Sequence, residues 1–122
     1  MGNPVGWFEI YVQDMARAKA FYQAVFQTEL ASLSAAEPEM WAFQGDMTSY
    51  GTPGALVRMD GCPSGGNSTL VYFSCKDCAV EAGRVAKAGG KVAKEKFAIG
   101  EYGFIALALD TEGNMFGLHS MA

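Results

Sequence analysis

The chain has 122 residues, the usual length of one domain, and this length is enough to bury a continuous core. Half of the residues are apolar and 18% are charged, a composition typical of a compact globular protein rather than a disordered one. The net charge of −4 argues against nucleic acid or an anionic membrane as a main partner, because phosphate groups are bound by basic surfaces.

The beginning of the chain and the cysteine content bear on location. Residues 1–6 have neither a basic segment nor a long apolar run, so no signal peptide is expected. No apolar stretch approaches the roughly 18 residues that a membrane span requires. The three cysteines, an odd number, do not form a disulfide framework. We therefore expect a cytoplasmic protein with no membrane partner.

The first half of the chain begins with a strand over residues 5–12, which are rich in β-branched and aromatic side chains. Its alternation places Phe8, Ile10 and Val12 on one face and Trp7, Glu9 and Tyr11 on the other. Asp14 then offers an N-cap to a helix that reaches about Phe26. The predicted buried stripe of this helix consists of Met15, Ala18, Tyr22 and Val25. Further strands are expected near residues 29–33, 40–45 and 54–59.

The second half follows a turn-rich linker at residues 60–67 and has the same order of elements. A strand over 69–75 leads to a second N-cap at Asp77 and to a helix that ends near residue 88, before Gly89 and Gly90. A strand is expected from residue 91 to 94 or slightly beyond. Residues 104–109 and 114–120 then form a closing hairpin.

The two halves are related by a shift of 63 residues, which places Asp14 on Asp77 and Tyr22 on Val85. Neither half is large enough to close a core alone. We therefore predict an α+β fold in one domain over 1–122, with two tandem βαβββ modules at about 4–60 and 68–122. The modules are expected to form a curved mixed sheet with helices on its convex face and a groove on its concave face.

Three segments carry a resemblance to a known family. Residues 7–22 (WFEIYVQDMARAKAFY), 88–92 (AGGKV) and 110–118 (DTEGNMFGL) resemble the glyoxalase, bleomycin-resistance and extradiol dioxygenase proteins of the vicinal-oxygen-chelate superfamily. The resemblance spans essentially the whole chain. It implies paired βαβββ modules and a homodimer that completes or stabilises the groove.

The same resemblance directs attention to four inward-facing strand positions, where metal-dependent members carry two His and two Glu. The corresponding residues are Trp7, seven before Asp14, then Leu70, Gly117 and a residue near Gly54. None of these side chains offers a lone pair to a divalent cation. We therefore expect no metal cofactor and no glyoxalase I chemistry.

Three polar residues are candidates for chemistry in the groove. Glu9 lies mid-strand, where it would act as a general base, orient a ligand, or serve as a structural carboxylate that is hydrogen-bonded or partly exposed. His119, the only histidine, would act as acid or base, or simply end its strand near solvent. Tyr72 would donate its hydroxyl to a ligand, or pack as an ordinary aromatic.

Other residues complete the predicted site. Trp7 and Tyr11 would wall an aromatic pocket together with Tyr72, and Leu70 and Gly117 would lie on the same inward face. Glu101 lies in the loop before the closing hairpin, where it would belong either to a pocket lid or to a solvated loop.

Two short motifs have structural explanations. Cys75 and Cys78 have the CxxC spacing, but no second pair completes a zinc site, so buried structural thiols are expected. Residues 64–66 (SGG) suggest an anion nest, but no helix follows directly, and a linker is expected.

Three functions remain open. The first is a metal-free protein that binds a small molecule in an aromatic groove around Glu9, as resistance members of the superfamily do. The second is a metal-independent isomerase or lyase with Glu9 as base and Tyr72 or His119 as proton donor. The third keeps a metal on ligands such as Glu9 and His119, as in a lactoylglutathione-lyase-like enzyme or a dioxygenase.

Overall fold

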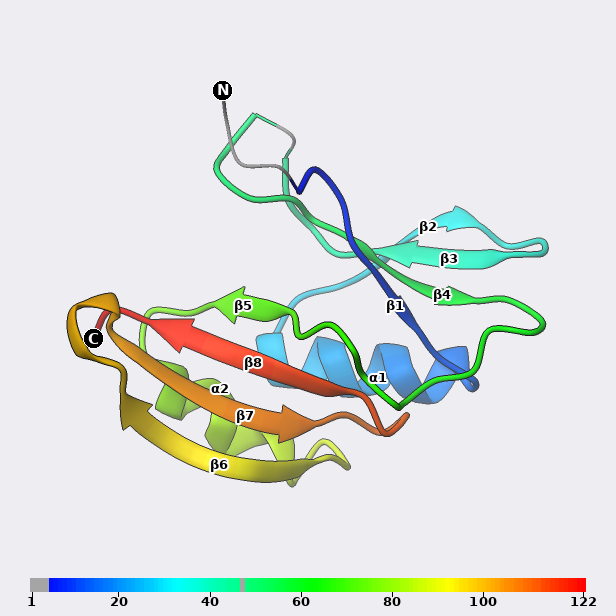
Figure 1. Cartoon of the computed structure of the whole chain (residues 1–122). Coiled ribbons are helices and arrows are strands. Elements are labelled where there is room, and N and C mark those ends of the chain that lie inside the picture. The colour runs from blue at the N-terminus through cyan, green and yellow to red at the C-terminus, as the bar shows by residue number, and fades with distance from the viewer. Residues whose placement is uncertain (1–4, 47) are drawn as a thin grey trace.

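The computed structural model describes residues 5–46 and 48–122, which form two α-helices and eight strands (Figure 1). The first module contains β1 (Glu9–Tyr11), α1 (Met15–Phe26), β2 (Ala31–Ser34), β3 (Glu39–Ala42) and β4 (Ala55–Arg58). The second contains β5 (Tyr72–Ser74), α2 (Cys78–Val85), β6 (Lys91–Ala98), the short 3₁₀-helix η1 (Gly100–Tyr102), β7 (Phe104–Leu109) and β8 (Met115–Ser120). The predicted α+β fold with tandem βαβββ modules is confirmed.

The strands are divided between two four-stranded sheets with the orders β1-β4-β3-β2 and β5-β8-β7-β6. In each sheet the first strand of the module pairs in parallel with the last, and the other neighbours are antiparallel. The strands β1 and β5 therefore occupy corresponding edges of the two sheets. This equivalence is the structural form of the repeat seen in the sequence.

The helices begin where the sequence predicts. Asp14 accepts a hydrogen bond from the backbone N–H of Arg17 (3.1 Å), and Asp77 accepts one from that of Ala79 (3.0 Å). The predicted stripe of α1 is buried, and Phe21 joins it. The helix α2 ends at Val85, earlier than predicted, and its buried residues are Cys78, Ala82 and Val85. Neither helix in the described part of the chain is long and apolar enough to cross a membrane.

The helix-facing sides of both sheets share one core. Phe21 and Tyr22 of α1 lie 5.9 and 5.6 Å from the ring of Phe116 on β8, between ring centroids. Ile10 of β1 and Leu118 of β8 belong to the same cluster of buried residues. Packing between the modules therefore completes a core that neither could close alone.

The turn between β7 and β8 ties the second module to the first through what we call the turn clamp, namely Asp110, Glu112 and Asn114. Glu112 Oε1 accepts the backbone N–H groups of Gln13 (2.7 Å) and Asp14 (3.0 Å). Its Oε2 accepts from Arg17 Nε at 2.7 Å. The carboxylate thereby provides hydrogen-bond acceptors for the backbone N–H groups at the corner between β1 and α1.

The other two members of the turn clamp reach different parts of the first module. Asp110 Oδ2 accepts the hydroxyl of Tyr22 (2.7 Å), and burial followed by this carboxylate raises the pKa of Tyr22 well above its usual value. Asn114 Nδ2 donates to the carbonyl of Tyr11 (2.9 Å), while Asn114 Oδ1 accepts from the N–H of Gly65 in the linker (2.7 Å). Hydrogen bonds from this five-residue turn therefore add to the shared core in fixing the relative placement of the two modules.

Candidate functional site

The faces of β1 follow the predicted alternation. Ile10 and Val12 are buried against the helices, whereas Glu9 is exposed and Tyr11 half-buried on the opposite face. Trp7 precedes β1 and is 37% exposed. The face that carries Glu9 is therefore directed away from the shared core.

The parallel registers define which positions of the two modules correspond. Glu9 pairs with Ala55 in the first module, and Tyr72 pairs with Gly117 in the second. The structural counterpart of Gly117 is therefore Ala55, one residue after the predicted Gly54. The sequence shift of 63 does not hold for β4 and β8, because the chain from Glu9 to Ala55 is one residue longer than that from Tyr72 to Gly117.

The donor set at these four positions does not fit a two-His, two-Glu metal site. Ala55 is fully buried and, like Trp7 and Leu70, carries no metal-binding atom. A Cβ at Gly117 would lie 2.2 Å from the ring of Tyr72, so this ring occupies the space that a carboxylate would need. Across residues 5–46 and 48–122, no three His, Cys, Asp or Glu side chains converge as potential metal ligands.

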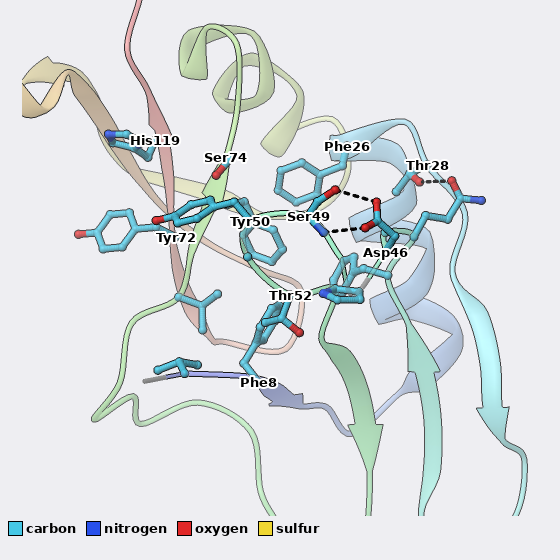
Figure 2. A pocket seen from close by; sticks show the side chains of 18 residues that line it. Phe8, Phe26, Thr28, Asp46, Ser49, Tyr50, Thr52, Tyr72, Ser74 and His119 are labelled. Carbon is cyan, nitrogen blue, oxygen red and sulfur yellow. Dashed lines mark hydrogen bonds between the residues drawn. The ribbon is translucent and has the colours of Figure 1, made fainter. Parts of the chain in front are cut away.

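A cavity of about 900 Å³ lies between the two modules (Figure 2). It is lined by the chain that enters β1, the carboxyl end of α1, the loop from β3 to β4, and β5 with the end of β8. Four phenylalanine rings form its apolar floor, namely Phe8, Phe26, Phe43 and Phe73. The centroids of Phe26 and Phe73 are 4.6 Å apart, and those of Phe43 and Phe73 are 5.4 Å apart.

One side of this cavity carries Tyr72, Ser74 and His119 (Figure 2). Tyr72 is 46% exposed, so its hydroxyl and one ring face remain accessible. His119 Nε2 lies 2.6 Å from the carbonyl oxygen of Tyr102, so this nitrogen carries a hydrogen and donates it. The contact links His119 to η1, where Glu101 is exposed and outside the cavity.

The opposite side is the loop between β3 and β4. Asp46 accepts hydrogen bonds from the backbone N–H groups of Thr48 (2.9 Å) and Ser49 (2.7 Å), and from both hydroxyls (2.6 and 2.9 Å). The hydroxyl of Thr48, then that of Ser49 and the two N–H groups, lower the pKa of Asp46 to about 2. The hydroxyl of Thr52 is buried and has no hydrogen-bond partner among the described residues.

A second cavity of about 430 Å³ lies between β1, the linker and the start of β8. Glu9 and Tyr11 line it, and the Tyr11 hydroxyl donates to Glu9 Oε1 at 2.8 Å. This hydrogen bond to a carboxylate is the main cause of a raised pKa for Tyr11. The structure therefore shows Glu9 as a hydrogen-bonded, exposed carboxylate.

The predicted site residues are thus distributed over two places within one chain. Glu9 and Tyr11 face the smaller cavity, and Tyr72 and His119 face the larger one. The remaining predicted residues line neither cavity, namely Trp7, Leu70, Gly117 and Glu101.

The sequence matches a known protein family over most of its length. The family model described as "Glyoxalase/Bleomycin resistance protein/Dioxygenase superfamily" matches residues 5–118. The chain belongs to this superfamily. No curated protein matches it.

Several solved structures share the fold of this superfamily member. A glyoxalase I mutant of Zea mays has a TM-score of 0.75 at 21% identity, over 96% of this chain and 45% of that one. TnmS3, an antibiotic binding protein from Streptomyces sp. CB03234, has a TM-score of 0.70 at 22% identity, over 98% and 97%. A hypothetical protein from S. aureus has a TM-score of 0.72 at 17% identity, over 98% and 95%.

The sequence of this superfamily member did not identify several residues that line the larger cavity. Phe26 ends a helix and Phe43 follows a strand, so each looked like ordinary packing. Tyr50 and Thr52 lie in a loop that has no hydrophobic period from which their direction could be predicted. Only the aromatic content of residues 41–50 offered a signal.

Of the two thiols predicted to be buried, Cys78 is buried and Cys75 is only half-buried. Cys78 is buried at the start of α2, and its N–H donates to Ser120 Oγ at 3.0 Å. Burial, followed by the nearby Glu81, raises the pKa of Cys75 to about 12. A thiol with so high a pKa is a poor nucleophile at neutral pH.

Proposed function

We propose that this superfamily member binds a small, largely aromatic organic molecule in the larger cavity without the help of a metal. The observation that carries the proposal is the size of this cavity, about 900 Å³, combined with its floor of four phenylalanine rings. Sites for small molecules are typically concave, apolar and a few hundred to a thousand Å³ in volume. Polar groups at its rim, such as Ser74 and Tyr72, would fix the orientation of the ligand.

Two further observations support this proposal. The four positions that correspond to metal ligands carry no donor atoms, so binding through aromatic contact is favoured over metal chemistry. TnmS3, which has the same fold, is an antibiotic binding protein, and this supports the proposal that the present chain holds an organic ligand. Because the two sequences are only 22% identical, the ligand of TnmS3 does not identify the ligand of this chain.

Filling the cavity tests the proposal. Ser74 is exposed on β5 and lines the cavity, so Ser74→Trp places an indole in the space that a ligand needs. A panel of aromatic metabolites and antibiotics is titrated by calorimetry. We expect ligands of the natural protein to bind at least about tenfold more weakly to the variant, because the indole would compete with them for space in the cavity.

The matched control is Ser32→Trp, which adds the same side chain to an exposed position of β2, away from the cavity. Its dissociation constants should stay within about twofold of the natural protein's. Silence of the natural protein across the whole panel, or equal weakening by both tryptophans, would refute binding in this cavity.

A homodimer and a cytoplasmic location remain part of the proposal. Ile105, Leu107 and Leu109 lie on the side of β7 that faces away from the helices, and all three are half-buried. A second copy on this face would bury these three side chains and would bring further residues to the predicted concave groove. Three free cysteines are compatible with a reducing compartment.

A second candidate function is a metal-independent isomerase or lyase at the smaller cavity, favoured by the pairing of Glu9 with Tyr11. A carboxylate that keeps one oxygen free beside a phenol has the parts of a base and a proton donor. Glu9→Gln preserves the shape and removes the basicity. Turnover of carbonyl compounds that lose an α proton should fall at least about a hundredfold.

The control for this assignment is Glu29→Gln, at another exposed glutamate, with folding followed by circular dichroism. Both variants should unfold at the same temperature as the natural protein. Activity that survives in Glu9→Gln would remove Glu9 from the mechanism.

A further inference from the structure

The lining of the larger cavity has an unequal distribution of charge. Among the described residues that line it, Asp46 is the only carboxylate and none is Lys or Arg. His119, on the side opposite Asp46 in Figure 2, is the other ionisable group besides the tyrosines. An anionic ligand would therefore find no fixed positive side chain in this wall.

The charge of Asp46 is not neutralised by its partners. All four of its hydrogen bonds come from uncharged donors, the N–H and hydroxyl groups of Thr48 and Ser49. Among the ion pairs between described residues, none includes Asp46. These donors hold its pKa at about 2, so the carboxylate stays charged at every pH at which the protein would work.

Tyrosine rings line the same cavity as this charge. Tyr50 belongs to the same loop and is 91% exposed, and Tyr72 stands across the cavity (Figure 2). The face of an aromatic ring attracts a cation through its quadrupole, and the attraction adds to that of a carboxylate. The net charge of the chain, −4, acts in the same direction at longer range.

We propose that the larger cavity selects aromatic cations, that is, organic amines carried on a ring system, over neutral and anionic molecules of the same shape. The ring system would cover the phenylalanine floor, and the ammonium group would lie near Asp46. This inference rests on the proposed function and names the ligand class of that site.

Three probes of nearly equal size separate the charge states: 2-naphthylmethylammonium, 2-naphthylmethanol and 2-naphthoate. Their dissociation constants are measured by following the backbone amide resonances of residues that line the cavity. We expect the ammonium to bind about threefold more tightly than the alcohol, and the alcohol about threefold more tightly than the carboxylate, as for unit charges several Å apart near water.

Asp46→Asn removes the charge and keeps an oxygen that accepts from Thr48 and Ser49. It should bring the ratio of ammonium to alcohol affinity close to one and leave the alcohol's affinity unchanged. Glu95→Gln is the matched control, because it removes the same charge from an exposed site on β6, outside the cavity. That variant should keep the threefold ratio.

The possible results distinguish the two levels of the proposal. If the alcohol and the carboxylate bind as tightly as the ammonium, or if Asp46→Asn and Glu95→Gln act alike, the ligand class is wrong while aromatic binding stands. If none of the probes shifts the cavity resonances up to its solubility limit, both the ligand class and the proposed function are overturned.

Discussion

Replacing Glu112 with alanine is expected to lower the free energy of unfolding by about 3 kcal/mol, measured by urea denaturation at pH 7. The Glu112 side chain is fully buried, and its carboxylate accepts two backbone N–H groups and pairs with Arg17 at 2.7 Å. Alanine leaves those N–H groups at the β1–α1 corner without their partner. Because Arg17 remains half exposed, its own loss of pairing adds little.

The pH dependence separates this carboxylate from a general packing effect. Burial alone would raise the pKa of Glu112, but Arg17 and the N–H groups of Asp14 and Gln13 outweigh it, and the pKa is lowered. A lowered pKa gives stability that is present above the ordinary glutamate value of about 4.3 and is lost as the pH falls through the folded value. The difference between the natural protein and Glu112→Ala should therefore shrink as the pH is lowered below about 4.

Two comparisons make this result decisive. Glu95→Ala, at an exposed position of β6, should change the stability by less than about 0.5 kcal/mol. A loss of under about 1 kcal/mol in Glu112→Ala would show that Glu112 does not hold the modules together. A difference that is constant down to pH 2 would show that its effect is one of packing and not of its charge.

The fold was open to prediction because its signals are local and repeated. Asp14 and Asp77 cap their helices as expected, and the stripe of α1 follows the period of a helix that packs on one side. Alternation along β1 also assigned Ile10 and Val12 to the buried face. Such patterns persist because local preference and tertiary burial favour the same arrangement.

The turn clamp and the larger cavity could not be predicted, because both are formed by contacts between residues that are distant in the sequence. Glu112 contacts residues 95 to 99 positions away, yet in the sequence it belongs to an ordinary polar turn. Asp46 and Tyr50 lie in a loop without a period. Glu9 was singled out because a carboxylate in an aromatic strand is unusual, but its nearest partner is Tyr11, two residues away.

The pair of Tyr72 and Gly117 shows that the aromatic wall leaves no room for a larger side chain at position 117. The ring of Tyr72 lies over Gly117 so closely that any Cβ there would displace it. Glycine at this position thus permits the ring to line the larger cavity. The sequence showed both residues, but only the register of β5 and β8 shows that they are directly paired.

Replacing Phe73 with alanine is expected to lower the free energy of unfolding by about 3 kcal/mol, because the ring is shared by the core and the cavity floor. Its centroid lies 4.6 to 6.0 Å from those of five other rings, namely Phe8, Tyr22, Phe26, Phe43 and Phe116. Phe97→Ala on the edge strand β6, measured in the same urea series, should cost less than about 1.5 kcal/mol, since Phe97 lies outside this cluster. Equal costs for the two variants would mean that the floor of the cavity is not a rigid part of the core, and a ligand would then have to order the rings as it binds.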